Sequence, residues 1–130
     1  MASNLSGLII KDEHLRRALE GREYLIVDGA MGTQMQERGL DALEAVPELL
    51  CKTHAAEIAA IHAAYIAAGA EVITTNTFSA NRLKLGDKMS VVEAYRLAAD
   101  CARAAGAPYI AGDIGPTGSL LEPMGTLSFD

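Results

Sequence analysis

The sequence predicts an α/β fold made of parallel β/α units, and three observations support this prediction. Three short apolar runs, at residues 24–27, 72–75 and 108–111, have the length and composition of buried strands. Two longer stretches with helical periodicity, residues 48–68 and 90–105, separate these runs. Because strands that alternate with helices pair in parallel through right-handed crossovers, we expect one parallel sheet.

The ends of the predicted helices carry their own signals. A short amphipathic helix is expected at residues 11–20, before the first strand. Ser90 and Glu93 have the spacing of a capping box at the start of the last helix. The segment between the first strand and the second helix is polar and is interrupted by Gly39 and Pro47. A glycine, the usual C-cap, follows each of the three helices: Gly21, Gly69 and Gly106.

Composition restricts the class of protein. The chain has 130 residues, a net charge of −6 and 50% hydrophobic residues, which indicates one globular unit and argues against a basic nucleic-acid-binding surface. Residues 1–7 lack the basic and apolar parts of a signal peptide. The most apolar stretch, residues 55–73, contains Glu57, His62 and Glu71, which argues against a membrane span. We therefore expect a cytoplasmic protein.

Small and polar residues follow each predicted strand. Parallel strands place their carboxyl ends on one edge of a sheet, where α/β proteins bind ligands. There, the carboxylate of Asp28 could accept hydrogen bonds from an ammonium group, and neighbouring backbone N–H groups could hold a carboxylate. This combination suits an amino acid. The three clusters are residues 28–33, 75–81 and 112–118.

Other interpretations of these clusters stay open on the residues alone. Gly29 and Gly32 supply only part of the Gly-x-Gly-x-x-Gly pattern of a dinucleotide loop, and an ordinary strand-to-helix turn also fits. Residues 75–81 could position a polar ligand, with Phe78 against its apolar part, or could serve as turn and capping residues. Asp113 could touch a ligand or stiffen a loop.

The cysteines and histidines predict no metal or nucleophile site. Cys51 and Cys101 lie in helix-like stretches without metal-ligand spacing, so we expect two small buried apolar side chains. The histidines are expected to be solvated or packed, and no nucleophile–histidine–acid arrangement is apparent from their spacing. They are His14, His54 and His62.

Taken together, the clusters resemble three motifs of the homocysteine S-methyltransferase family. Residues 28–33 are similar to the first motif, residues 71–78 to the second and residues 110–118 to the third, in the family's order and at similar separations. The resemblance begins near Leu15 and is closest to the homocysteine-binding domains of cobalamin-dependent methionine synthases. It implies that residues 1–130 are a single partial domain, truncated at its C-terminus. We expect the N-terminal part, about three strands, of a (β/α)8 TIM barrel, preceded by a leader with a short helix at residues 1–21.

The resemblance also implies a reaction and a set of binding residues. Members of the family methylate homocysteine to methionine, and a zinc ion holds the substrate sulfur as a thiolate. Methylcobalamin is the favoured methyl donor, with S-methylmethionine and betaine as alternatives. The zinc ligands are cysteines of later strands that Cys51 and Cys101 do not match, so neither a metal ligand nor a catalytic residue is expected in this chain. The residues expected to bind homocysteine are Asp28, Gly29, Ala30, Thr75, Asn76 and Thr77.

A chain that carries part of the homocysteine site but none of the zinc ligands is expected to be part of a methyltransferase and to be inactive when isolated. A half-barrel would leave unpaired strand edges, through which it could self-associate. The alternative is a non-catalytic amino-acid-binding or self-assembling half-barrel fragment, and a nucleotide-binding α/β domain is a third possibility. Neither a nucleic acid nor a membrane is expected as a partner.

Overall fold

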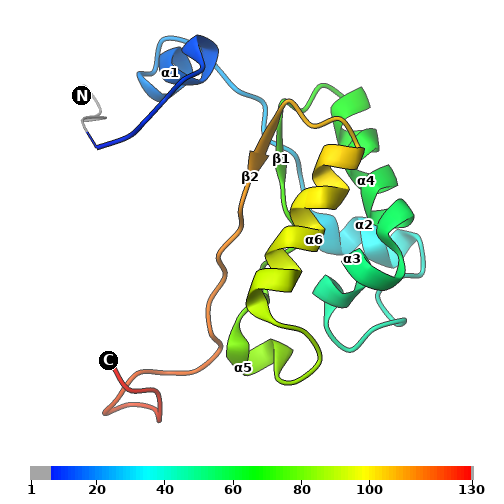
Figure 1. Ribbon diagram of the computed structural model, residues 1–130, viewed down its shortest axis with the longest axis vertical. Coiled ribbons are helices and arrows are strands. Elements are labelled where there is room, and N and C mark those ends of the chain that lie inside the picture. Colours follow the sequence, from blue (N-terminus) through cyan, green and yellow to red (C-terminus); the bar gives the residue numbers. More distant parts are fainter. Residues whose placement is uncertain (1–6, 130) are drawn as a thin grey trace.

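The computed structural model describes residues 7–129 and shows helices alternating with short parallel strands (Figure 1). Residues 1–6, part of the predicted leader, lie outside the described residues. No helix of the described segment is long and apolar enough to cross a membrane. The elements in chain order are α1 (Glu13–Leu19), α2 (Met31–Glu37), the 3-10 helix η1 (Pro47–Leu49), α3 (Leu50–Thr53), α4 (Ala55–Ala67), β1 (Val72–Thr74), α5 (Arg82–Leu85), α6 (Val91–Ala104) and β2 (Tyr109–Ala111).

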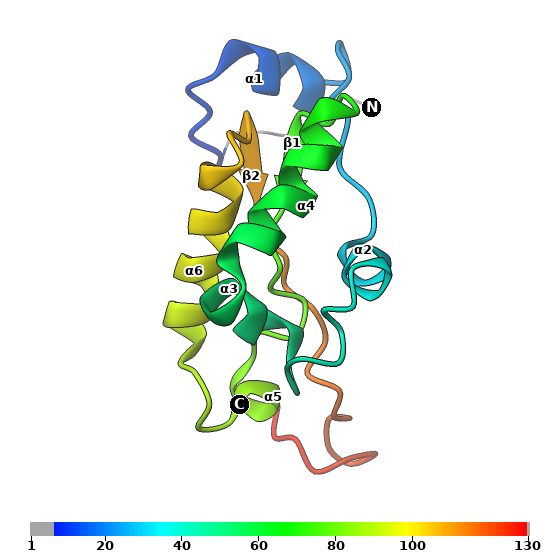
Figure 2. The same cartoon turned by 90° about the vertical axis from the view of Figure 1, so that its right-hand side faces the viewer.

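The second and third predicted strands are confirmed as β1 and β2. They pair in parallel, with Ile73 opposite Ile110. Helices α4 and α6 both cover one face of this sheet, as the two perpendicular views show (Figures 1 and 2). Ile73 is fully buried in a cluster with Ala70 and Ala102. The sheet is therefore anchored to its helices by the central residue of β1.

The first predicted strand, residues 24–27, pairs with β1 as expected, but its predicted burial on both faces is wrong. Only Val27 forms a bridge, to Val72, and it is parallel. Tyr24 is 92% exposed and Val27 56% exposed, whereas the prediction required burial on both faces. The physical reason is that α4 and α6 lie on one side of the sheet, so this run has no second apolar layer among the described residues. The described sheet has two strands, β1 and β2, and the (β/α)8 barrel stays a prediction.

The predicted helix at residues 48–68 is interrupted. It consists of η1, α3 and α4, and the break falls at His54, whose φ of −136° and ψ of 45° are not helical. Just before the break, the Thr53 hydroxyl donates to the Leu49 carbonyl oxygen at 3.2 Å, a contact that competes with regular helical bonding. The polar segment before it also contains α2, which the sequence analysis did not predict.

The last predicted helix is confirmed as α6. One of the two hydrogen bonds of its predicted capping box is present. The Ser90 hydroxyl oxygen accepts a hydrogen bond from the Glu93 backbone N–H at 3.1 Å. The Glu93 side chain does not reach back to the cap, because its carboxylate forms an ion pair with Lys52 at 3.1 Å. This ion pair ties α6 to α3, and the buried residues Cys51 and Cys101 lie in the core between the same helices, as predicted.

Candidate functional site

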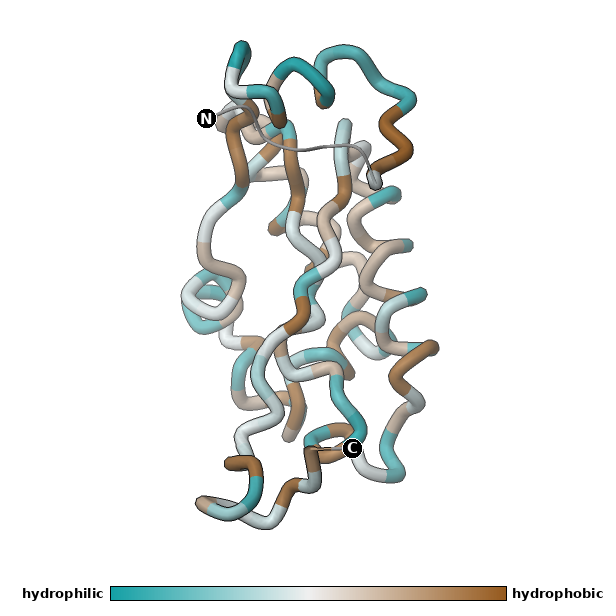
Figure 3. Tube along the Cα trace, turned by 90° about the vertical axis from the view of Figure 1, so that its left-hand side faces the viewer, coloured by the Kyte–Doolittle hydropathy of each residue, from teal (hydrophilic) through white to brown (hydrophobic). Residues whose placement is uncertain are grey.

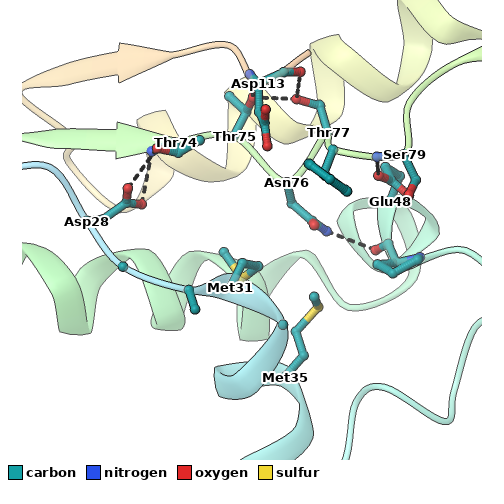
Figure 4. Close-up of a pocket in the computed structure, with 15 residues that line it drawn as sticks. Asp28, Met31, Met35, Glu48, Thr74, Thr75, Asn76, Thr77, Ser79 and Asp113 are labelled. Atoms are coloured by element: carbon teal, nitrogen blue, oxygen red, sulfur yellow. Dashed lines mark hydrogen bonds between the residues drawn. The ribbon is translucent and has the colours of Figure 1, made fainter. Parts of the chain in front are cut away.

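Three segments that follow the strands meet around one cavity of about 370 Å³ (Figure 4). They are the residues after the Val27 bridge, after β1 and after β2, as expected for parallel strands. The structure thus brings every residue of the predicted site to one place, although it does not test what they bind. All six line the cavity: Asp28, Gly29, Ala30, Thr75, Asn76 and Thr77.

Asp28 is held in place by a single neighbour, Thr74, at the end of β1. One carboxylate oxygen accepts from the Thr74 backbone N–H at 2.9 Å, and the other accepts from the Thr74 hydroxyl at 2.8 Å. The Asp28 backbone N–H donates to the Val72 carbonyl oxygen at 3.0 Å. Since a carboxylate oxygen can accept more than one hydrogen bond, each oxygen of the oriented Asp28 side chain can still accept from a ligand.

The hydroxyl groups of Thr75 and Thr77 hold the loop after β2. The Thr77 hydroxyl donates to the Asp113 carbonyl oxygen at 2.8 Å, and the Asp113 backbone N–H donates to the Thr75 hydroxyl oxygen at 3.2 Å. The two hydroxyl oxygens lie 2.7 Å apart. Because the Thr77 proton is already committed, Thr75 must donate to Thr77. Both threonines therefore shape the cavity and leave no hydroxyl proton for a ligand.

Asn76 connects the end of β1 to the helical segment on the other side of the cavity. Its side-chain amide nitrogen donates to the Pro47 carbonyl oxygen at 2.9 Å and to the Cys51 sulfur at 3.6 Å. The side chain is buried, with 6% exposure for the residue. Asn76 therefore fixes the distance between β1 and η1, which form two walls of the cavity.

Several cavity residues were missed by the sequence analysis. Met31 and Met35 on α2 form one wall, and their spacing of four residues is a helical signal within the segment interpreted as a loop. Glu48 was also missed, although an acid between apolar residues is unusual. It is 1% exposed and accepts from the Ser79 backbone N–H, while its second oxygen has no partner among the described residues.

Two glycines allow backbone segments to approach closely here. A Cβ atom at Gly29 would lie 3.0 Å from the Tyr65 ring, whose hydroxyl donates to the Ala30 carbonyl oxygen. A Cβ atom at Gly115 would lie 2.0 Å from the Phe78 carbonyl oxygen. Any larger residue at Gly115 would push the loop after β2 away from the residues that follow β1.

The charges around the cavity are of one sign. Three carboxylates line it, from Asp28, Glu48 and Asp113, and the lining contains neither lysine, arginine nor histidine. Opposite them, α2 begins without a side-chain cap because Ala30 occupies the N-cap position, so its first N–H groups lack the usual side-chain acceptor. The cavity therefore offers acceptors for a cationic group, and the residues at the start of α2 belong to its lining.

The residues of the described segment do not fit a zinc ion. No group of three histidine, cysteine, aspartate or glutamate side chains between residues 7 and 129 could hold a metal. Cys51 and Cys101 are buried in the core between the helices and do not line the cavity. A metal bound at this cavity would have to take its ligands from other residues.

Comparisons with known proteins agree on one family. A model of the homocysteine S-methyltransferase family matches residues 25–130. The chain is 33% identical to the methionine synthase of Mycobacterium leprae over 120 residues, which cover 80% of this chain and 10% of that protein. It is 39% identical to the methionine synthase of Mycobacterium tuberculosis over 71 residues, covering 51% of this chain and 6% of that protein. The chain thus spans a tenth or less of the length of these curated relatives.

Proposed function

This chain belongs to the homocysteine S-methyltransferase family, and we propose that its cavity holds the amino-acid part of homocysteine while the substrate sulfur is methylated to give methionine. The observation that carries the proposal is the arrangement of charge around the cavity. Three acidic residues line a ligand space without a basic side chain, and the uncapped start of α2 lies opposite them. An ammonium group and a carboxylate on one small molecule complement such a site.

In the proposed complex, Asp28 accepts hydrogen bonds from the ammonium group. Thr74 orients both Asp28 oxygens and so reduces the loss of side-chain entropy on binding. The N–H groups near Gly29 and Ala30 hold the substrate carboxylate. The sulfur-bearing chain packs on Met31 and Met35, which adapt to irregular apolar groups. Thr75, Asn76 and Thr77 position η1 and the loop after β2, the other walls of the cavity, through their own hydrogen bonds.

The described residues do not supply the ligands that the cofactors of the reaction would need. We propose that zinc, which would keep the substrate sulfur nucleophilic, is held by residues beyond the part of the chain that the structure describes. We further propose methylcobalamin as the methyl donor, and a cytoplasmic location. In this proposal residues 1–130 are the N-terminal portion of the homocysteine-binding domain and do not transfer methyl groups by themselves.

A calorimetric titration with homocysteine tests the assignment of Asp28. We expect Asp28→Asn to weaken binding at least about tenfold, because it removes a charge-assisted hydrogen bond of about 1.5 kcal/mol or more. Thr74→Val is the matched control, since it removes a contact to Asp28 but keeps the charge, and its effect should be smaller. Both variants are compared with the wild type for thermal unfolding before titration.

A ligand without the ammonium group shows whether Asp28→Asn removes one contact to the ligand or disturbs the whole cavity. Asp28→Asn should leave the affinity for 4-mercaptobutanoate unchanged, because this analogue has no group that needs the Asp28 charge. An equal loss for both ligands would show that the substitution disturbs the cavity as a whole. If Asp28→Asn binds homocysteine as tightly as the wild type does, Asp28 does not belong to the site.

A non-catalytic, self-assembling fragment is the second candidate. It is favoured by apolar side chains that are left exposed beside the sheet, among them Ile26 at 57%, Val27 at 56% and Ile114 at 86% exposure. β2 pairs only with β1 in the described sheet, so its other edge is open to a further strand. Binding of homocysteine without turnover, together with stable association, would support this second function.

A further inference from the structure

Two thiols meet between α3 and α6, away from the proposed homocysteine cavity. Cys51 is 1% exposed and Cys101 is 3% exposed, and both belong to the same buried cluster. The Cys101 thiol donates to the Cys51 carbonyl oxygen at 3.9 Å, and the Cys51 thiol donates to the Cys101 sulfur. Both cysteines are free in the structure. Folding therefore brings together two reduced sulfurs from distant parts of the chain.

A surface groove of about 300 Å³ leads to both cysteines. It runs between α4 and α6, and small apolar side chains make up most of its walls. Asp100 is the single charged residue of the lining and would repel an anion. The groove therefore suits a small, neutral reagent. The remaining lining residues are Ala55, Ala56, Ala59, Leu97 and Ala104.

The hydrogen bonds make the two sulfurs chemically unequal. The Cys51 thiol bonds to the Cys101 sulfur, which lowers the pKa of Cys101, and the same bond together with burial raises the pKa of Cys51. Since the thiolate is the reactive form of cysteine, Cys101 is the better nucleophile of the pair. The Asn76 amide also donates to the Cys51 sulfur at 3.6 Å.

We propose that Cys51 and Cys101 form a redox modification site, at which hydrogen peroxide produces a disulfide between α3 and α6. The Cys101 thiolate attacks one peroxide oxygen, the O–O bond breaks, and hydroxide leaves and takes up the thiol proton to form water. The resulting sulfenic acid is attacked by the Cys51 sulfur. The S–S bond forms, the S–O bond breaks, and the oxygen leaves as a second water with the Cys51 proton. Two thiols are oxidised and one peroxide is reduced.

Mass spectrometry of the full chain tests this proposal. After peroxide treatment, unfolding and alkylation, the wild type should have lost two hydrogen atoms and taken up no alkyl group, and its peptides with Cys51 and Cys101 should be cross-linked. The reaction should be at least about tenfold slower in urea, because only the folded chain holds the sulfurs at high effective concentration. Two alkylated cysteines, dimers instead of the internal bond, or an equal rate in urea would each overturn the proposal.

Single variants test the order of the two sulfurs. Cys51→Ala should leave a sulfenic acid on Cys101 that dimedone traps, because the resolving thiol is missing. Cys101→Ala should leave Cys51 unmodified at the same peroxide dose, since burial, which remains in this variant, still raises the pKa of Cys51. The reverse pattern would contradict the assignment of Cys101 as the attacking sulfur. If either variant fails to fold, mass spectrometry of the wild type still tests whether the disulfide forms.

Discussion

At the scale of single residues, His62 is a buried polar side chain whose two ring nitrogens both lack a hydrogen-bond partner among the described residues. It lies on α4 with no exposed surface. Burial lowers the pKa of His62, and the nearby charge of Asp28 opposes this effect. A neutral, unpaired imidazole in the core costs desolvation energy without a compensating hydrogen bond. Its position beside the sheet thus weakens the fold.

Replacement of His62 by leucine should stabilise the chain. His62→Leu keeps a similar volume and removes two unpaired polar atoms, so we expect the free energy of unfolding to rise by about 1 kcal/mol at neutral pH. In the wild type, the unfolded chain takes up a proton at His62 more readily than the folded chain. Stability should therefore fall as the pH drops below the ordinary value of 6.5. Chemical denaturation across this range measures both effects.

The control for His62→Leu is the same change at His54, which is only partly buried. His54→Leu should leave the acid dependence of stability in place. An unchanged acid dependence in His62→Leu would show that other groups cause it. A loss of several kcal/mol in His62→Leu would mean that the ring makes packing contacts that leucine cannot replace.

At the scale of elements, α1 is attached to the sheet by polar contacts. His14 on α1 contacts the carboxylates of Glu23 and Glu71, the latter at 3.2 Å, and Glu71 lies just before β1. Tyr109 on β2 donates to the Asp12 carboxylate at 2.7 Å. None of the α1 residues is buried. Attachment of this helix therefore depends on charge far more than that of α4 or α6.

The attachment of α1 should weaken as the pH rises. Hydrogen bonds that His14 donates to the carboxylates of Glu23, the larger effect, and Glu71 raise the pKa of His14 above its ordinary value of 6.5. A raised pKa in the folded state contributes stability that is complete below 6.5 and is lost as the pH increases through the raised value. Hydrogen exchange of the α1 amides, corrected for intrinsic rates, should accelerate over this range. In His14→Gln, which cannot titrate, the corrected rates should not depend on pH there.

At the scale of the whole molecule, the two long helices α4 and α6 lie on one side of the sheet. Figure 3 views the chain from the opposite side, where hydrophobic stretches alternate with polar ones along the exposed strand-like segments. The free edge of β2 carries Ile110, which is 37% exposed. An open edge with apolar neighbours is a template for pairing with another strand.

We therefore expect the chain to self-associate through this edge. Light scattering during size exclusion should give a mass that increases with concentration. Ile110→Lys should shift the chain toward the monomer, because a charge on an edge strand opposes pairing. Val92→Lys is the matched control, since Val92 is 79% exposed but lies on α6, away from the edge. A monomer at every concentration that unfolds cooperatively would contradict this prediction.

The sequence by itself determined the periodic elements and the motifs that follow the strands. β1, β2 and α6 have regular patterns with clear end signals, so their type and order could be predicted within a residue or two. The meeting of the six proposed site residues also followed from the sequence, because parallel strands must end on the same edge. The family resemblance, carried by these motifs, was confirmed by the comparisons.

Only the tertiary structure decided what these residues contact. Residues 24–27 have the composition of a buried strand, yet burial also needs a covering layer on each face, which is a property of the assembled sheet. Glu48 and the two methionines of α2 became cavity residues because chain segments distant in sequence fold over the strand ends. The pairing of Cys51 with Cys101 likewise has no local signal. Contacts between distant segments depend on packing in three dimensions, which local periodicity does not encode.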